Sequence, residues 1–492
     1  MGEIERVKML FNSIDFAIFL PIVLILYWFL ANKNLKLQNF LIVAASYLFY
    51  GWWDWRFLSL ILFSTIVDYS VGLGLLKQEN LTKRKILLWI SVLVNLGLLG
   101  FFKYYNFFLD NFITAFSFFG TEIKANSLNI ILPVGISFYT FQTLSYSIDV
   151  YKRKLEPTKD FIAFSAFVSF FPQLVAGPIE RARNLLPQFY KKRTFDYSKA
   201  VDGMRQILWG LFKKIVIADN CAVFADQIFN NSHDYSGSTL VLGAIFFAFQ
   251  IYGDFSGYSD IAIGTARLFG FNIMQNFAFP YFSRDIAEFW RRWHISLSTW
   301  FRDYLYIPLG GSRGSINKKI RNIFIIFIVS GFWHGANWTF IIWGALNALY
   351  FLPLFLLNKN RNNLNIAAEG KIIPTINEVI NITLTFSITV FAWIFFRAES
   401  VTHAFSFIKH LVNNLYIEIP KILVVGKWHL FITCILILIF TTIEWMGREG
   451  QYAIEKYSSN WNRVSKWLFY YLILISIFIY STNQQEFIYF QF

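Results

Sequence analysis

Long apolar runs, separated by short loops that carry basic residues, dominate this chain. Several runs approach the ~20 apolar residues that a helix needs to cross a bilayer core of ~30 Å. They lack the alternation of apolar and polar residues found in transmembrane barrel strands, so they predict helices. The runs lie at Ile14–Ala31, Phe57–Leu76, Ile86–Phe102, Leu240–Phe255, Ile320–Trp333, Trp338–Leu357, Ile380–Phe396, Leu430–Trp445 and Trp467–Tyr480. The pattern predicts an all-α protein that crosses a membrane many times.

Basic residues gather in the loops between these runs, for example at Arg181–Arg193 and Lys359–Lys371. Short loops rich in Lys and Arg normally stay on the cytoplasmic side. With these loops on that side, the last apolar run exits outward, and residues 481–492 are expected outside the cytoplasm. Two segments do not fit a simple crossing. Asp160–Pro178 is predicted to re-enter on one face, and Arg284–Arg313 is predicted to lie at the membrane interface or dip into it.

Composition agrees with this membrane assignment. The chain is 56% hydrophobic, 20% aromatic and 15% charged, whereas a typical soluble domain has about 25% charged residues. Its net charge of +14 does not indicate nucleic-acid binding, because the basic residues follow the loop pattern. Cys221 and Cys434 form neither a disulfide framework nor a metal motif. Residues 1–492 are predicted to form a single integral-membrane domain whose first apolar run is retained.

Two histidines stand in apolar sequence, where an ionisable side chain is costly and therefore points to a function. His334 follows an apolar run in the block Phe-Trp-His-Gly-Ala-Asn-Trp338, and its small neighbours permit close approach of a ligand. An imidazole, with an unperturbed pKa of ~6.5, is a natural general base near neutral pH. Asn337 adds an amide that can orient a group or donate to an oxyanion. The alternative is a core histidine whose nitrogens are satisfied by neighbours.

His294 is the second candidate catalytic residue, in the block Trp-Arg-Arg-Trp-His-Ile-Ser-Leu-Ser298, where Ser298 is a candidate orienting group. The same block also suits an interfacial belt of tryptophans and arginines. The arginines in and after it are predicted to hold the phosphates of a cytosolic donor, because a planar guanidinium makes bidentate contacts with phosphate. A solvated positive face is the alternative. These arginines are Arg291, Arg292, Arg302 and Arg313.

Zinc is the competing explanation for the histidine pair. The chain lacks HExxH and CxxC spacing, so no metal is predicted. Asp254 and Asp260 interrupt an apolar run, and they suit a structural role better than direct catalysis. The aromatic residues 487–492 suit an interfacial anchor. Alternatively they fold back into a pocket and present Tyr489, whose phenol (pKa ~10) a histidine base can activate.

Four ordered blocks resemble the membrane-bound O-acyltransferase (MBOAT) family, in its bacterial alginate O-acetylation branch. They end at Asp260 (Gly-Asp-Phe-Ser-Gly-Tyr-Ser-Asp), Ser298 (Phe-Trp-Arg-Arg-Trp-His-Ile-Ser-Leu-Ser), Gly311 (Arg-Asp-Tyr-Leu-Tyr-Ile-Pro-Leu-Gly-Gly) and Trp338 (Phe-Trp-His-Gly-Ala-Asn-Trp). The resemblance implies eleven or more transmembrane helices, with re-entrant and interfacial helices, around a central funnel or tunnel. It also implies that His334 is the family's signature histidine and His294 its second one.

The resemblance further implies an acyl donor on the cytoplasmic side and an acceptor across the membrane. Together with the two histidines and the basic cluster, it leads to the hypothesis of an enzyme that moves an acetyl group from a cytosolic thioester, acetyl-CoA, across the bacterial inner membrane. In this hypothesis the final acceptor is an extracytoplasmic polysaccharide such as alginate, reached through an extracytoplasmic serine-hydrolase-like O-acetyltransferase, with Tyr489 as a candidate relay. No bound cofactor is expected beyond that donor substrate, and membrane lipid surrounds the chain. Three alternatives stay open: transfer of D-alanyl or another acyl group, a polytopic transporter, and a non-catalytic scaffold.

Overall fold

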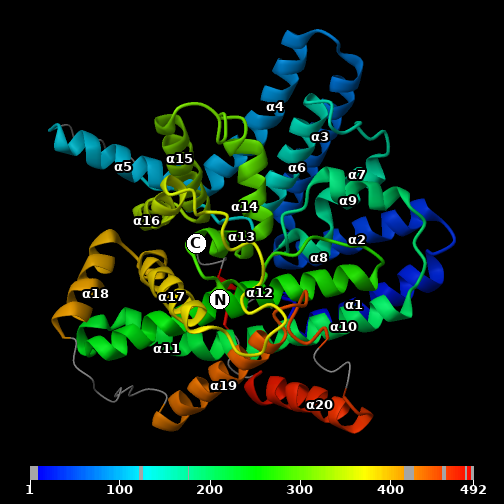
Figure 1. Cartoon of the computed structure of the whole chain (residues 1–492). Helices are drawn as coiled ribbons and strands as arrows, with labels where there is room; N and C mark the ends of the chain where they lie inside the picture. The colour runs from blue at the N-terminus through cyan, green and yellow to red at the C-terminus, as the bar shows by residue number, and fades with distance from the viewer. Residues whose placement is uncertain are drawn as a thin grey trace, which may run out of the picture. The chain divides into compact units, whose positions relative to one another are not determined.

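The computed structural model describes residues 9–120, 126–175, 177–414, 426–456, 461–481 and 485–488. Helices and connecting loops make up these residues, with no strand among them (Figure 1). Seven helical segments of the described part are long and apolar enough to cross a membrane, which confirms the polytopic all-α prediction. They are Leu35–Lys77, Leu81–Phe118, Gly237–Leu268, Trp338–Leu356, Ile376–Arg397, Trp428–Met446 and Arg463–Tyr480. Eleven or more spans and a central tunnel stay predictions.

The chain folds into two compact units. The first unit comprises residues 1–203 and 265–274, and the second comprises 204–264 and 275–492. That residues 1–492 act as a single domain stays a prediction.

The first unit contains α1 to α9 and the start of α10. Short polar side chains start several of these helices: Asn34 caps α2, Asn80 caps α4 and Asp160 caps α7, each by accepting backbone N–H groups of the first turn. The helices are α1 Ile14–Ile25, α2 Leu35–Asp54, α3 Leu58–Lys77, α4 Leu81–Leu99, α5 Tyr105–Phe118, α6 Ile136–Tyr151, α7 Phe161–Ser169, α8 Phe171–Leu174, α9 Ala182–Leu185 and α10 Tyr197–Leu211.

The described part of the segment expected to re-enter, Asp160–Pro178, contains the short buried helices α7 and α8. Phe170 separates them with a non-helical backbone (φ −51°, ψ 101°). A helix rises about 1.5 Å per residue, so neither piece is long enough to span a bilayer. Irregular backbone of this kind is tolerated at membrane depth when protein covers it. The broken geometry is therefore compatible with a re-entrant element.

The second unit contains the rest of α10 and then α11 to α20, except for the C-terminal end of α12 from residue 265 onward. The segment expected at the interface, Arg284–Arg313, is again divided into pieces too short to cross, α13, α14 and the π-helical turn η8 Arg302–Tyr306. The helices are α11 Asp219–Asn230, α12 Gly237–Leu268, α13 Ile286–Arg292, α14 Ile295–Phe301, α15 Ile316–His334, α16 Trp338–Leu356, α17 Ile376–Arg397, α18 Val401–Asn413, α19 Lys427–Met446 and α20 Arg463–Tyr480.

Helices α15 and α16 pack at very short range. A Cβ on Gly331 would lie 2.2 Å from the carbonyl oxygen of Phe340, and one on Gly344 would lie 2.4 Å from that of Phe327. Only glycine permits this approach, as in other closely packed membrane helices. The pairing fixes the C-terminal end of α15, where His334 lies.

A π-helical turn, η5 Phe212–Ala218, interrupts the continuous helix formed by α10 and α11. It carries Lys213 and Lys214 side by side in the sequence, and both are buried. Lys213 pairs with Asp260 of α12 (2.6 Å), while Lys214 pairs with Asp254 of the same helix (2.8 Å). The two aspartates that interrupt the apolar run of α12 are therefore the counter-ions of buried lysines.

Candidate active site

His294 directly precedes α14 and has a left-handed backbone conformation (φ 43°, ψ 54°). This conformation is uncommon for a residue with a side chain. It is stabilised from both sides, because the N–H of Ile295 donates to the carbonyl oxygen of Asn276 (2.9 Å) and the N–H of Ser298 donates to that of His294 (3.0 Å). The side chain is 1% exposed. A strained, over-determined backbone at a buried histidine is typical of functional sites.

The hydrogen bonds of Asn276 define the tautomer of this ring. Oδ1 of Asn276 accepts from the N–H and hydroxyl of Ser296 (3.3 and 2.8 Å), and it faces Nδ1 of His294 at 3.0 Å. Nδ1 must therefore carry a proton, which leaves a lone pair on Nε2. Nε2 is buried and makes no hydrogen bond within the described residues. His294 lies outside the helices of spanning length, and burial lowers its pKa to about 3, so the ring is neutral near pH 7.

His334 ends α15 and is 2% exposed. Its ring centroid lies 6.4 Å from that of His294, although 40 residues separate the two in sequence. Trp343 of α16 and Phe396 of α17 pack edge-on against it at 5.2 and 5.3 Å. The structure thus brings the two predicted histidines together within an aromatic enclosure.

A cavity of about 400 Å³ lies next to the histidine pair in the second unit. Ser330, four residues before His334 on α15, and Ser298, four residues after His294, both line it. Four residues correspond to about one helical turn, so the cavity comes within a turn of each histidine. Its walls are largely apolar, with Phe327 among them. The volume suits an organic ligand, since such sites commonly measure ~300–1,000 Å³.

The predicted arginines take different positions around this cavity. Arg291 and Arg302 line it, as does Arg361 from the loop between α16 and α17. Arg292 and Arg313 do not appear among the lining residues. Arg313 is exposed, and Arg292 is taken up by an internal ion pair. The cavity therefore has three cationic side chains, of which Arg361 was not predicted from the sequence.

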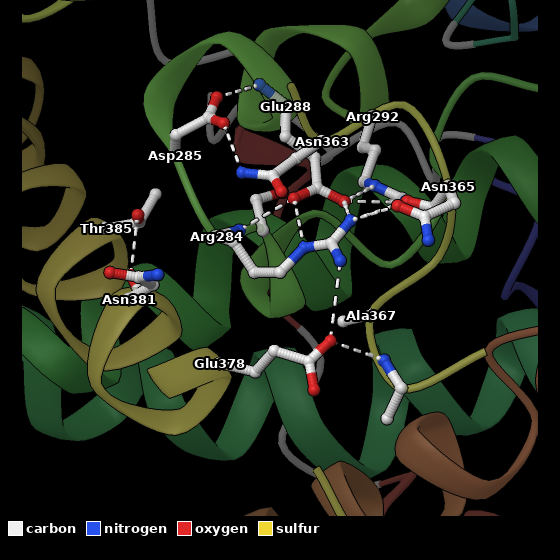
Figure 2. A network of polar contacts seen from close by, with 12 residues as sticks. Arg284, Asp285, Glu288, Arg292, Asn363, Asn365, Ala367, Glu378, Asn381 and Thr385 are labelled. Carbon is white, nitrogen blue, oxygen red and sulfur yellow. Dashed lines mark hydrogen bonds and ion pairs between the residues drawn. The ribbon is translucent and has the colours of Figure 1, made fainter. Parts of the chain in front are cut away.

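A polar network attaches the loop between α16 and α17 to the rest of the unit (Figure 2). Arg284 donates to Glu288 (3.0 Å), to Glu378 at the start of α17 (3.4 Å) and to the carbonyl oxygen of Asn365 (2.7 Å). Arg292 donates to Glu288 (3.0 Å) and to the same carbonyl oxygen (2.9 Å). Glu288 and Glu378 are charged, and the carbonyl oxygen of Asn365 accepts from both arginines. These charge-assisted contacts fix the loop that forms one wall of the cavity.

Of the remaining predicted residues, Asn337 forms local hydrogen bonds and Tyr489 lies outside the described residues. Asn337 caps α16 by accepting from the N–H of Thr339 (3.0 Å), and it donates to the carbonyl oxygen of Glu399 (2.8 Å). Its role toward an oxyanion stays a prediction. Tyr489 lies outside the described residues. In the described part, no group of three or more His, Cys, Asp or Glu side chains is arranged to hold a metal ion.

Sequence reasoning missed Asn276 and Arg361. Asn276 lies in a stretch without a motif, and only the folded chain shows that it faces His294. Arg361 belongs to a loop far along the chain from the other arginines. A basic loop next to an apolar run was visible in the sequence, but it does not tell which side chain reaches the cavity.

Helices of spanning length, a buried histidine pair and an adjoining cavity define a membrane enzyme. The sequence model of the MBOAT, membrane-bound O-acyltransferase family matches residues 152–397, which include both histidines and the cavity. Similarity to curated relatives extends further along the chain. The chain therefore belongs to the membrane-bound O-acyltransferase family and is a multi-pass O-acyltransferase.

The relatives act on different polymers, according to their names. A probable alginate O-acetylase of Pseudomonas aeruginosa is 42% identical over 80% of this chain and 73% of its own length. A peptidoglycan O-acetyltransferase of Helicobacter pylori is 34% identical over 98% of both chains. A teichoic acid D-alanyltransferase of Bacillus subtilis is 29% identical over 45% of this chain and 58% of its own length.

Proposed function

We propose that the protein moves an acetyl group from a cytosolic thioester, acetyl-CoA, to the exterior of the bacterial inner membrane for O-acetylation of an envelope polysaccharide such as alginate. The observation that carries this proposal is the buried pair His294 and His334 beside a cavity with arginines at its wall. Acetyl transfer is favoured over D-alanyl transfer because the O-acetylase relatives are more similar and match more of the chain.

The cavity suits the arm of the donor. Its apolar wall and its volume suit an acyl thioester, and Arg291, Arg302 and Arg361 are the groups that would bind phosphates of a nucleotide moiety by charge-assisted hydrogen bonds. The segments carrying these arginines belong to the basic regions expected on the cytoplasmic side. The thioester carbonyl would then point toward Ser298 and Ser330, and so toward the histidines.

In the transfer step, the oxygen of an acceptor hydroxyl attacks the thioester carbonyl carbon. A C–O bond forms, the C–S bond breaks, and the thiol leaves. His334 takes the hydroxyl proton as general base. His294, whose Nε2 bears a lone pair, shares in this proton transfer and returns a proton to the leaving sulfur. Asn337 is the candidate donor to the tetrahedral oxyanion, a contact whose loss typically costs about 3–4 kcal/mol of barrier.

The proposed acceptor on the protein is Tyr489. An aryl ester lies between a thioester and an alkyl ester in reactivity, so acetyl can pass down this series without further energy input. An extracytoplasmic serine-hydrolase-like O-acetyltransferase would then transfer acetyl from the tyrosine to the polysaccharide.

The test compares His334→Ala, His294→Ala and Tyr489→Phe in cells at matched protein level, by the ester content of the extracellular polymer. All three should abolish acetylation. The control is His429→Ala, which removes an imidazole of α19 that hydrogen-bonds to Asn220 of α11. Unchanged ester content with His334→Ala would refute the catalytic proposal. Unchanged content with Tyr489→Phe alone would refute only the relay.

The donor is tested with purified protein in lipid. Release of free thiol from acetyl-CoA and from a D-alanyl thioester is compared in the same preparation. Preferential turnover of D-alanyl thioester would overturn the acetyl assignment while leaving the acyltransferase chemistry in place.

A further inference from the structure

A buried cluster in the second unit binds the main chain of residues 485–488. Nζ of Lys214 forms ion pairs with Asp219 (2.8 Å) and Asp254 (2.8 Å), and it donates to the carbonyl oxygen of Gln485 (2.9 Å). The ammonium group therefore has three oxygen neighbours, one of which belongs to the bound segment. The side chains of the three cluster residues are 1–3% exposed.

The segment completes the charge balance of this cluster. Two carboxylates face one ammonium, and a buried charge is costly unless it is paired and hydrogen-bonded. The main chain supplies the missing donors: the N–H of Ile488 donates to Oδ2 of Asp254 (2.6 Å), and the backbone of Gln485 hydrogen-bonds to Asp219. The helices alone therefore leave the cluster incomplete.

An aromatic contact places the segment close to the histidine pair. The ring of Phe487 packs on Tyr258 (centroids 4.3 Å apart) and contacts Phe255 (6.0 Å). Phe255 also meets the ring of His294 edge-on at 4.6 Å. The segment and His294 thus contact the same phenyl ring.

We propose that Lys214, Asp219 and Asp254 are positioning residues that hold residues 485–488 by their main chain and so deliver Tyr489 for acylation. Consecutive Cα atoms are about 3.8 Å apart, so fixing Ile488 limits how far the next residue can move from the site. The proposal rests on the tyrosine relay put forward above. It adds the groups that hold the acceptor, which none of the sequence motifs indicated.

Asp254→Asn tests this role without changing the size of the side chain. Oδ1 of Asp254 pairs with Lys214 and Oδ2 accepts from the N–H of Ile488, so an amide at this position must turn its NH₂ group toward a cation or a donor. Asp260→Asn is the matched control. Asp260 lies on the same helix, pairs with Lys213 (2.6 Å) and accepts from Gln206 (2.7 Å), and these two are not among the residues that hold the segment.

Two quantities are measured on purified protein in lipid with [¹⁴C]acetyl-CoA: label retained on Tyr489, and hydrolytic release of free CoA. We expect Asp254→Asn to lower labelling on the order of tenfold to a hundredfold, as misplacement by about 1 Å can do, with CoA release nearly unchanged. Asp260→Asn should retain labelling. Equal labelling in the two variants, or equal loss of labelling and of CoA release in Asp254→Asn, would overturn the proposal.

A second variant and a second readout guard against simple misfolding. Phe487→Ala leaves the ionic cluster intact and should also lower labelling without lowering CoA release. Ile488→Cys, placed in a Cys221→Ala and Cys434→Ala background, should react slowly with maleimide until Asp254→Asn is added. Full reactivity before that addition would show that residues 485–488 are not held by the cluster. Failure of the relay itself is distinguishable, since polymer acetylation would then survive Tyr489→Phe.

Discussion

Replacing Asn276 by alanine tests whether the orientation of His294 matters for turnover. The change removes the acceptor of the Nδ1 proton and leaves the N–H of Ser296 without its partner. A neutral hydrogen bond contributes about 0.5–1.5 kcal/mol net, and a buried donor left unsatisfied costs about 1–3 kcal/mol. Since about 1.4 kcal/mol equals a factor of ten, the population of the productive tautomer should fall roughly tenfold.

The assay is the pH dependence of kcat for acetyl transfer by purified protein. Asn276→Ala should lower kcat roughly tenfold with little change in KM, because donor contacts lie in the cavity. Ser259→Ala is the matched control, since the hydroxyl of Ser259 accepts from the NH₂ group of Asn276 (3.1 Å) on the side of the amide away from its carbonyl oxygen Oδ1. A full loss of activity in His294→Ala together with full activity in Asn276→Ala would refute the reasoning.

Asn276→Asp tests the same contact in the opposite direction, by strengthening the acceptor at Nδ1 instead of removing it. A carboxylate beside Nδ1 favours the imidazolium, so it should raise the pKa of His294 from about 3 toward its ordinary value of ~6.5. A protonated ring has no lone pair on Nε2, so the variant should lose activity as the pH falls through the raised pKa. In the parent protein this ring stays neutral over the same range. Superimposable pH profiles would contradict the assignment.

Three further outcomes follow from the described contacts. Arg361→Ala should raise KM for acetyl-CoA several-fold by removing a charge-assisted phosphate contact worth about 1 kcal/mol or more, whereas Arg313→Ala, outside the cavity, should not. Burial raises the pKa of Glu180 to about 7, so above that pH the folded state must hold a buried carboxylate, which destabilises it. Glu180→Gln should therefore raise Tm at pH 8 and leave it unchanged at pH 5, where the folded protein holds the neutral acid. Glu288→Gln should lower stability by about 3–5 kcal/mol, as for breaking a buried ion pair, and Asp303→Asn should change it little; equal Tm values for these two variants would show that the loop network is not stabilising.

Much of the fold was predictable because long apolar runs directly predict helices of membrane-spanning length. The run Phe57–Leu76 agrees with α3 within one residue at each end. Helix α2, Leu35–Asp54, was missed because polar side chains interrupt its apolar run. One of them, Asn39, is buried and donates to the carbonyl oxygen of Phe189 (2.9 Å). A polar residue that is satisfied by a distant partner looks like a loop residue until that partner is known.

The candidate site was predictable only where chemistry and local sequence coincide. His294 and His334 stood out because imidazoles are rare in apolar sequence. Lys214 also lies in an apolar run, yet its three acceptors come from Asp219 nearby and from residues about 40 and 270 positions away. Such a set forms only through tertiary packing, which hydrophobic periodicity does not encode.

The π-helical turn Phe212–Ala218 has a consequence for how this protein tolerates length changes. Such a turn holds one residue more than an α-helical turn, so deletion of a single residue there would restore regular α-helical winding. Since each α-helical residue advances the helix by about 100°, the lysines would be rotated relative to the aspartates of α12. A one-codon deletion would thus break both buried ion pairs while leaving every charged residue in the sequence.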